Sequence, residues 1–180
     1  FSAIGTIGST PVGIAVNASL PVTNLAEWVA YARARPKQLS YGSGGAWGTL
    51  HLCMESMNEQ AGIQMLHVPY TSAPATYNAM LGGQIHAYCA AGPTMVTILK
   101  QDKLRLLAVT SLKPSRLIPN VPPIADTLPG FEMDVWLGLA TTRGTPPEVV
   151  SRINSEVVKA VKNPEPVSYT HLTLPTILLV

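Results

Sequence analysis

The sequence predicts an α/β protein built on a doubly wound sheet. Short β-rich segments alternate with amphipathic helical segments from residue 11 to residue 110, the pattern of strands joined by crossover helices. Charged residues make up only 12% of the 180 residues, against a usual share of roughly 25%. Apolar residues reach 47%. Few charges combined with many Val, Ile and Leu residues are typical of parallel strands covered by helices.

The first part of the chain predicts a strand followed by a helix. Residues 11–17 (PVGIAVN) form a β-rich run, and Asn24 with Glu27 forms a variant of the capping box that opens a helix. Arg35-Pro36 ends this helix, because the residue before a proline disfavours the helical conformation. Four residues share the apolar face of the helix and are predicted to be buried: Leu25, Trp28, Val29 and Ala32.

A glycine-rich loop follows the next apolar run, Leu39–Tyr41. Glycines at positions 42, 44, 45 and 48 allow positive φ values and leave no Cβ between backbone N–H groups and a ligand. A helix is predicted to begin near Thr49, and its N-terminus adds unpaired N–H donors and about half a positive charge. The stretch therefore suits an oxyanion or a carboxylate. A tight strand-to-helix turn without a ligand explains the glycines equally well.

Two phosphate-binding motifs are excluded in this loop. The Walker motif needs a lysine at the helix start, and no lysine lies between Lys37 and Lys100. The dinucleotide motif needs GxGxxG, and Trp47 occupies the position of its third glycine. A bulky Trp47 indicates an apolar wall beside the polar loop, which fits a small organic acid better than a nucleotide.

Three more strands and two more helices are predicted before residue 111. Ser72 is an N-cap candidate with Pro74 in the first helical turn, and Gly82-Gly83 ends that helix. A further helix follows Gly92, again with proline at its start. The predicted strands are 63–70, 85–90 and 104–110, and the second helix is 94–99.

The composition changes after residue 112. Prolines crowd residues 113–130, which predicts an irregular connection from a central domain to a second one. Residues 131–142 predict a strand, and Thr145 with Glu148 forms a second capping box. The helix that follows is predicted to bury Val150, Ile153, Val157 and Val161.

Three strand-to-helix junctions are small and polar: 42–49, 71–74 and 91–94. In a doubly wound sheet they lie at the carboxyl ends of their strands, where such folds bind ligands. A hydrolase using Ser43 and His51 is the alternative. The nucleophile elbow needs GxSxG, however, and Tyr41 stands at its first glycine. Binding without chemistry is therefore the favoured interpretation.

Composition also excludes several classes of function. A net charge of +2, with the basic residues scattered, does not predict nucleic-acid binding. No apolar run approaches the roughly 18 residues of a membrane span. No histidine or cysteine has the spacing of a metal site, and no cofactor is predicted. Cys53 and Cys89 are predicted to be buried free thiols, with a disulfide left open.

Five segments carry a pattern that extends, in register, from about Phe1 to Asn163. They are YGSGG…HL at 41–52, HVPY…PA at 67–75, MLGGQI at 80–85, LRLLAVTS at 104–111 and FEMDVWLGL at 131–139. In this order they resemble the Bug-type extracytoplasmic solute receptors of tripartite tricarboxylate transporters. The resemblance implies a periplasmic-binding-protein type II-like fold with two doubly wound lobes joined by crossing strands. It also implies a periplasmic receptor that binds a carboxylate, without altering it, for the membrane components of a transporter.

The resemblance and the three polar junctions together suggest which residues face the ligand. They come from the three junctions: Ser43, Gly44, Gly45, Ala46, Trp47, Thr49, His51, Tyr70, Ser72, Ala73, Gly92 and Thr94. Trp47 stands where the family usually has glycine. Because an indole offers a large stacking face, Trp47 favours a ligand with an aromatic or apolar body.

The resemblance and the composition together predict four parts. These are a crossing strand with a remnant of the terminal lobe (1–16), a nearly complete central lobe (17–111), a return connection with part of the terminal lobe (112–163), and a tail (164–180). The tail resembles translated vector sequence, so neither it nor His171 enters the fold prediction. We expect a fragment of a longer receptor that binds its ligand weakly and self-associates through the helix after Pro146.

Overall fold

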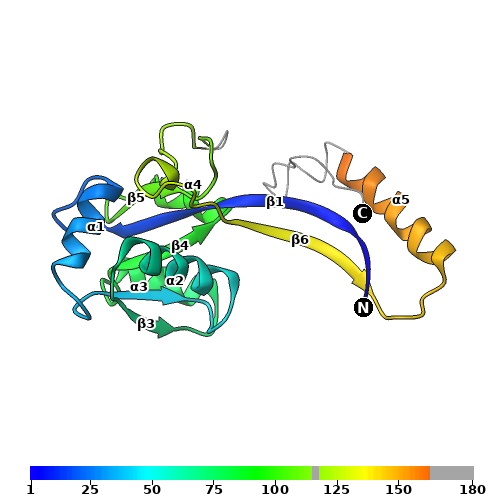
Figure 1. Ribbon diagram of the computed structural model, residues 1–180, viewed down its shortest axis with the longest axis horizontal. Coiled ribbons are helices and arrows are strands. Elements are labelled where there is room, and N and C mark those ends of the chain that lie inside the picture. The colour runs from blue at the N-terminus through cyan, green and yellow to red at the C-terminus, as the bar shows by residue number, and fades with distance from the viewer. Residues whose placement is uncertain (115–117, 163–180) are drawn as a thin grey trace. The chain divides into compact units, whose positions relative to one another are not determined.

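The computed structural model describes residues 1–114 and 118–162, and the predicted tail lies outside them (Figure 1). The chain divides into two compact units. The central unit is Pro11–Met133, and the outer unit combines Phe1–Thr10 with the chain from Asp134 on. Strand β1 (Ser2–Asn17) gives its first part to the outer unit and its second part to the central unit. It is longer than the predicted strand 11–17.

The central sheet has the strand order β3-β2-β4-β1-β5. Besides β1, its strands are β2 (Ser40–Ser43), β3 (Leu66–Pro69), β4 (Ala87–Ala91) and β5 (Leu104–Val109). β2 pairs in parallel with β3 and β4, whereas β1 pairs antiparallel with β4 and β5. The expectation of a parallel sheet is therefore wrong at β1. The two-residue alternation of a strand is the same in either direction, so the sequence pattern does not reveal this reversal.

The helices of the central unit are α1 (Leu25–Arg33), α2 (Thr49–Ala61), α3 (Ala73–Leu81) and α4 (Pro93–Ile98). Both predicted N-caps are confirmed: the Asn24 side chain accepts from Glu27 N at 2.9 Å, and Ser72 Oγ accepts from Ala75 N at 3.3 Å. The predicted apolar face of α1 is buried as expected. Figure 1 shows α2 and α3 beside β2 and β4, which they contact.

The proline-rich stretch packs on the central unit. Its described residues, 113, 114 and 118–130, are irregular, as predicted, apart from a single bridge between Pro123 and Val109 and a 3-10 turn at Ile124–Asp126. Ile118, Val121 and Ile124 are buried, and the first two belong to the hydrophobic core of the sheet. This stretch therefore completes the central unit as well as leading out of it.

Both cysteines are free and buried, as the sequence predicts. Burial, and then the hydrogen bond and charge of the neighbouring Cys53 thiol, raise the pKa of the Cys89 thiol well above its ordinary value. The pair thus joins α2 to β4 as a packed contact between two thiols.

The outer unit has two strands and a helix among its described residues. Strand β6 (Asp134–Thr141) pairs with β1, and helix α5 (Pro147–Lys162) is joined to β1 by Asn154 Nδ2, which donates to Ile4 O at 2.6 Å. No described residue of α5 is buried. The expected burial of its four apolar residues is therefore wrong, because the outer unit offers too little surface to cover them. No helix in the described ranges is long and apolar enough to cross a membrane.

Candidate functional site

The parallel pairing of β2, β3 and β4 brings the three predicted junctions to one edge of the sheet. The register pairs Ser43 with Pro69 at the carboxyl ends of β2 and β3, and Gly42 with Tyr88 in β4. The loop 44–48, the start of α3 and the start of α4 follow these ends directly. From the sequence, the junctions are expected to lie together, because doubly wound folds bind ligands at the carboxyl ends of their strands. The strand pairing supports this expectation.

Gly44 is the point where the first two junctions touch. A Cβ at Gly44 would lie 3.0 Å from Ala73 N and 3.2 Å from Ser72 C, both backbone atoms. Tyr70 N also donates to Ser43 O at 2.8 Å, which extends the pairing of β2 and β3 by one residue. A side chain at position 44 would push the start of α3 away from the loop, so glycine is needed here for close approach.

The N-terminus of α2 follows the same loop and has no side-chain cap. Gly48 is its N-cap residue, and no side chain in the described structure caps the helix. Leu52 N donates to Gly48 O, which leaves the N–H groups of Thr49, Leu50 and His51 ahead of the regular helical bonds. Gly45 has φ 142°, and a Cβ there would meet open space. The loop therefore borders an open region beside unpaired donors, whereas the Ser72 side chain already caps α3.

Ser43 is used inside the loop. Its Oγ donates to Gly45 O at 2.9 Å, accepts from Gly45 N at 3.3 Å and lies 2.7 Å from His67 Nε2. A hydroxyl has one proton and two lone pairs, so His67 Nε2–H is the donor in the last bond. Ser43 is only 1% exposed. It holds the loop in place, and its predicted contact with a ligand remains a prediction.

His67 is a residue of this site that the sequence interpretation missed. It lies in β3, pairs across the sheet with Tyr41 and stacks on it, with ring centroids 5.0 Å apart. The centroid of the His51 ring lies 4.0 Å from the centroid of the His67 ring, and the two ring planes are tilted by 34°. The sequence feature that could have identified His67 is its position, two residues before the carboxyl end of the strand β3.

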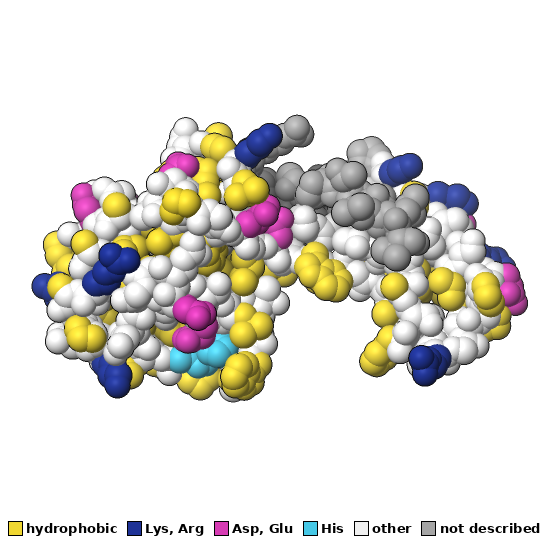
Figure 2. Space-filling model, viewed as in Figure 1, with side chains coloured by type: hydrophobic (Ala, Val, Ile, Leu, Met, Phe, Trp, Pro, Cys, Tyr) yellow, Lys and Arg dark blue, Asp and Glu magenta, His cyan; other side chains and the backbone are white. Residues whose placement is uncertain are grey.

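Two further contacts fix this group of rings. His51 Nδ1 accepts from Trp47 N at 3.1 Å, and the Tyr41 hydroxyl donates to Glu55. Burial, and then the charge of His51, lower the pKa of His67, while Glu55 acts in the opposite direction. Figure 2 shows histidine at the surface of the central unit bordered by acidic and hydrophobic side chains. The tilted pair of imidazole rings, with Tyr41 stacked on His67, thus packs against the loop.

This geometry does not assemble a hydrolase centre. Ser43 is bonded to His67 rather than to His51, and it is nearly inaccessible. Within residues 1–114 and 118–162, neither Ser43 nor His67 forms a hydrogen bond to a carboxylate. The same ranges hold no group of three His, Cys, Asp or Glu side chains able to bind a metal ion.

The remaining predicted residues lie at the same edge in different surroundings. Ala46 and Trp47 are exposed in the loop, and Tyr70 is half-buried beside Gly42. Gly92 has φ 51° and is buried, while Thr94 is half-buried in the first turn of α4. The structure brings residues 43–51 together with 70–73. It places Gly92 and Thr94 at the same edge only through the pairing of β4 with β2.

Comparison with known proteins gives a consistent result. The model of the tripartite tricarboxylate transporter family receptor matches residues 1–173. A Cupriavidus necator protein, described as a UPF0065 protein in the gbd 5′ region, is 35% identical over 152 residues, which are 84% of this chain and 46% of that protein.

Solved structures agree with this match. The R. palustris protein Rpa4515 with adipate has a TM-score of 0.86 at 30% identity, and the periplasmic binding protein BugD has 0.82 at 26%. Each comparison covers 95% of this chain and 57% of the other. The chain spans about half the length of the curated relatives it matches.

The role assigned to His67 predicts a change in the pH dependence of stability. Since the pKa of His67 is lowered below the ordinary 6.5, the unfolded chain takes up the proton first as the pH falls. The free energy of unfolding should therefore decrease below about pH 6.5. His67→Gln keeps a donor for Ser43 but cannot titrate, so this decrease should become shallower in urea denaturation between about pH 8 and 5.

His67→Ala is the matched control for that experiment. It removes the donor as well as the titration, so it should lose about 1 kcal/mol already at about pH 8. Equal pH slopes for the unmodified chain and His67→Gln would contradict the role given to His67.

Proposed function

We propose, since the chain belongs to the tripartite tricarboxylate transporter receptor family, that it supplies one wall of a binding site for a small organic carboxylate. The observation that carries this proposal is the uncapped N-terminus of α2 beside the glycine loop. Unpaired N–H groups and the positive end of the helix dipole attract an anion, and a carboxylate oxygen fits where a capping side chain would sit. The R. palustris relative bound to adipate supports the same ligand class.

The proposed receptor binds its ligand without changing it. A buried, internally bonded Ser43 offers no nucleophile at the surface, and the exposed groups of the loop are backbone N–H donors and the Thr49 hydroxyl. Such groups stabilise a negative charge but transfer no atoms. We further propose that the protein acts in the periplasm and passes its carboxylate to the membrane components of a tripartite transporter, as its family membership suggests.

The cap-free helix gives a sharp test. Gly48 has φ −70° and ψ 160°, an ordinary N-cap conformation, and a Cβ there would lie 3.6 Å from Gly45 O. Gly48→Asp should therefore cap α2 with its own carboxylate, raise stability by a few tenths of a kcal/mol and compete with the ligand. We expect adipate to shift the amide signals of Thr49 and Leu50 in the NMR spectrum of the unmodified chain, and to lose this effect in Gly48→Asp.

Gly48→Ala is the control, because alanine adds a Cβ but no acceptor. It should leave the adipate titration unchanged. The dissociation constant should lie well above the micromolar range, since one exposed helix terminus contributes about 0.3–1 kcal/mol and micromolar binding needs about 8 kcal/mol. Adipate that shifts amides only outside the three junctions, or that binds Gly48→Asp equally well, would refute the proposed site.

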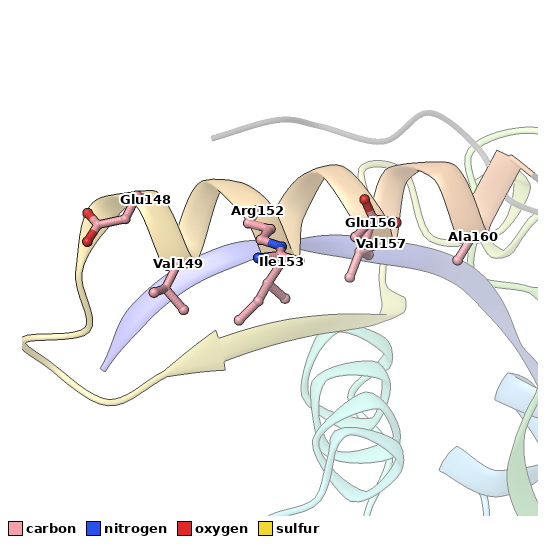
Figure 3. A pocket seen from close by; sticks show the side chains of 7 residues that line it. All are labelled: Glu148, Val149, Arg152, Ile153, Glu156, Val157 and Ala160. Carbon is pink, nitrogen blue, oxygen red and sulfur yellow. The ribbon is translucent and has the colours of Figure 1, made fainter.

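We also propose that this chain self-associates through the exposed face of α5. Val149, Ile153, Val157 and Ala160 point to one side of the helix and line an open hollow of about 740 Å³ together with Glu148, Arg152 and Glu156 (Figure 3). Ile153 is 36% exposed although it lies at the centre of this stripe. An apolar helical stripe with charged flanks is the pattern that a second helix covers.

Concentration-dependent light scattering tests this association. The apparent mass of the chain should rise with concentration and should fall back in Ile153→Glu, which places a charge in the stripe. Ser155→Glu is the control, because Ser155 is exposed but does not line the hollow. A monomeric mass at every concentration, or equal masses for both variants, would rule the interface out.

A further inference from the structure

We infer that Trp47 is a stacking surface that makes the site prefer carboxylates with a flat aromatic body. This inference rests on the proposed carboxylate site and adds the class of ligand to it. Trp47 lies in the loop between Gly45 and Gly48, one residue before the N-cap of α2. Its indole is 81% exposed. A large apolar ring is thus presented to solvent next to the unpaired N–H donors of the helix.

The direction of the indole is fixed even though its surface is free. Trp47 has φ 66°, a left-handed conformation that costs free energy in a residue with a Cβ. Its backbone N–H donates to His51 Nδ1 at 3.1 Å, and its ring meets the His51 ring edge to face, with centroids 5.8 Å apart and planes at 86°. Because His51 is itself buried, with its ring centroid 4.0 Å from that of His67, the indole rests on a packed group of rings.

Exposure alone does not distinguish Trp47 from the other tryptophans. Trp28 is fully buried in the core, and Trp136 is 69% exposed on β6 of the outer unit. Of the three tryptophans, only Trp47 combines exposure with a left-handed backbone, a backbone N–H bonded to His51 and a place beside the uncapped end of α2. A residue that served the fold alone would sit in the core or, at this φ, would be glycine or asparagine.

The short separation along the chain between the indole ring of Trp47 and the N–H donors of α2 limits the size of the ligand. The ring belongs to the residue before the N-cap, and the donors belong to the first turn of the helix, so the two features are within a few residues of each other. A carboxylate attached directly to a flat ring, as in benzoate, reaches both at once. An aliphatic acid of similar size gains the helix N-terminus but not the aromatic stacking. Stacking of this kind should make benzoate bind roughly 2–10-fold more tightly than cyclohexanecarboxylate.

NMR titration of the whole chain with benzoate, cyclohexanecarboxylate and adipate tests the inference. The indole N–H signals of the three tryptophans are assigned from single substitutions, and Trp28 serves as a buried reference. We expect benzoate to shift the Trp47 indole signal and to bind more tightly than its saturated analogue. The preference should vanish in Trp47→Gly and persist in Trp136→Leu.

Folding is not at risk in the key variant. Glycine relieves the left-handed strain at position 47, and no core side chain is removed, so Trp47→Gly should unfold at an equal or higher temperature. Equal affinities for benzoate and cyclohexanecarboxylate, or a shift of Trp136 alone, would overturn the role of Trp47 and leave the carboxylate site standing. If none of the three acids shifts the α2 amides, the proposed function fails and this inference fails with it.

Discussion

The close approach of Gly44 to the first residues of α3 is the constraint on which the candidate site depends. It exists because β2 and β3 run in parallel and end side by side, with Ser43 opposite Pro69. Glycine lets the loop rest against the backbone of Ser72 and Ala73, whereas a Cβ would require these atoms to move by a few tenths of an ångström. The uncapped end of α2 and the capped end of α3 are consequently held in one place, so the proposed ligand would meet donors that are already arranged.

Beside that contact lies a layer of polar side chains, most of them buried or half-buried, that fixes the loop from inside. His67 donates to Ser43, the imidazole rings of His51 and His67 lie 4.0 Å apart, and the hydroxyl of Tyr41 donates to Glu55. Buried polar groups that are fully paired make a local structure rigid, whereas a single lost partner is costly. The layer explains how a loop with four glycines keeps one conformation and how an exposed indole at Trp47 keeps its direction.

Local chemistry made much of this predictable from the sequence. The caps at Asn24 and Ser72, the helix start at Thr49 and the buried face of α1 follow from short-range rules and are confirmed. The loop was recognised from its glycines, and the resemblance that placed it in a receptor family is borne out by the family match.

What the sequence did not reveal depends on contacts between distant segments. The antiparallel course of β1, the pairing of His67 with Tyr41 and Ser43, and the uncovered face of α5 are set by tertiary arrangement rather than by periodicity. An amphipathic pattern indicates that one face of a helix is apolar and favours burial, but it does not indicate which segment of the chain packs against that face. The ligand-facing residues drawn from the family resemblance remain predictions for the same reason.

The most direct test of the account is the adipate affinity and thermal midpoint of Gly44→Ala beside those of Gly48→Ala. A methyl group at position 44 must displace backbone atoms of Ser72 and Ala73 at 3.2 and 3.0 Å, whereas at position 48 its nearest neighbour lies 3.6 Å away. Overpacking of this kind costs about 1–3 kcal/mol, so Gly44→Ala should melt at a lower temperature and lose the adipate-induced shifts at the start of α2. A Gly44→Ala chain with unchanged stability and unchanged adipate binding would contradict the claim that this contact builds the site.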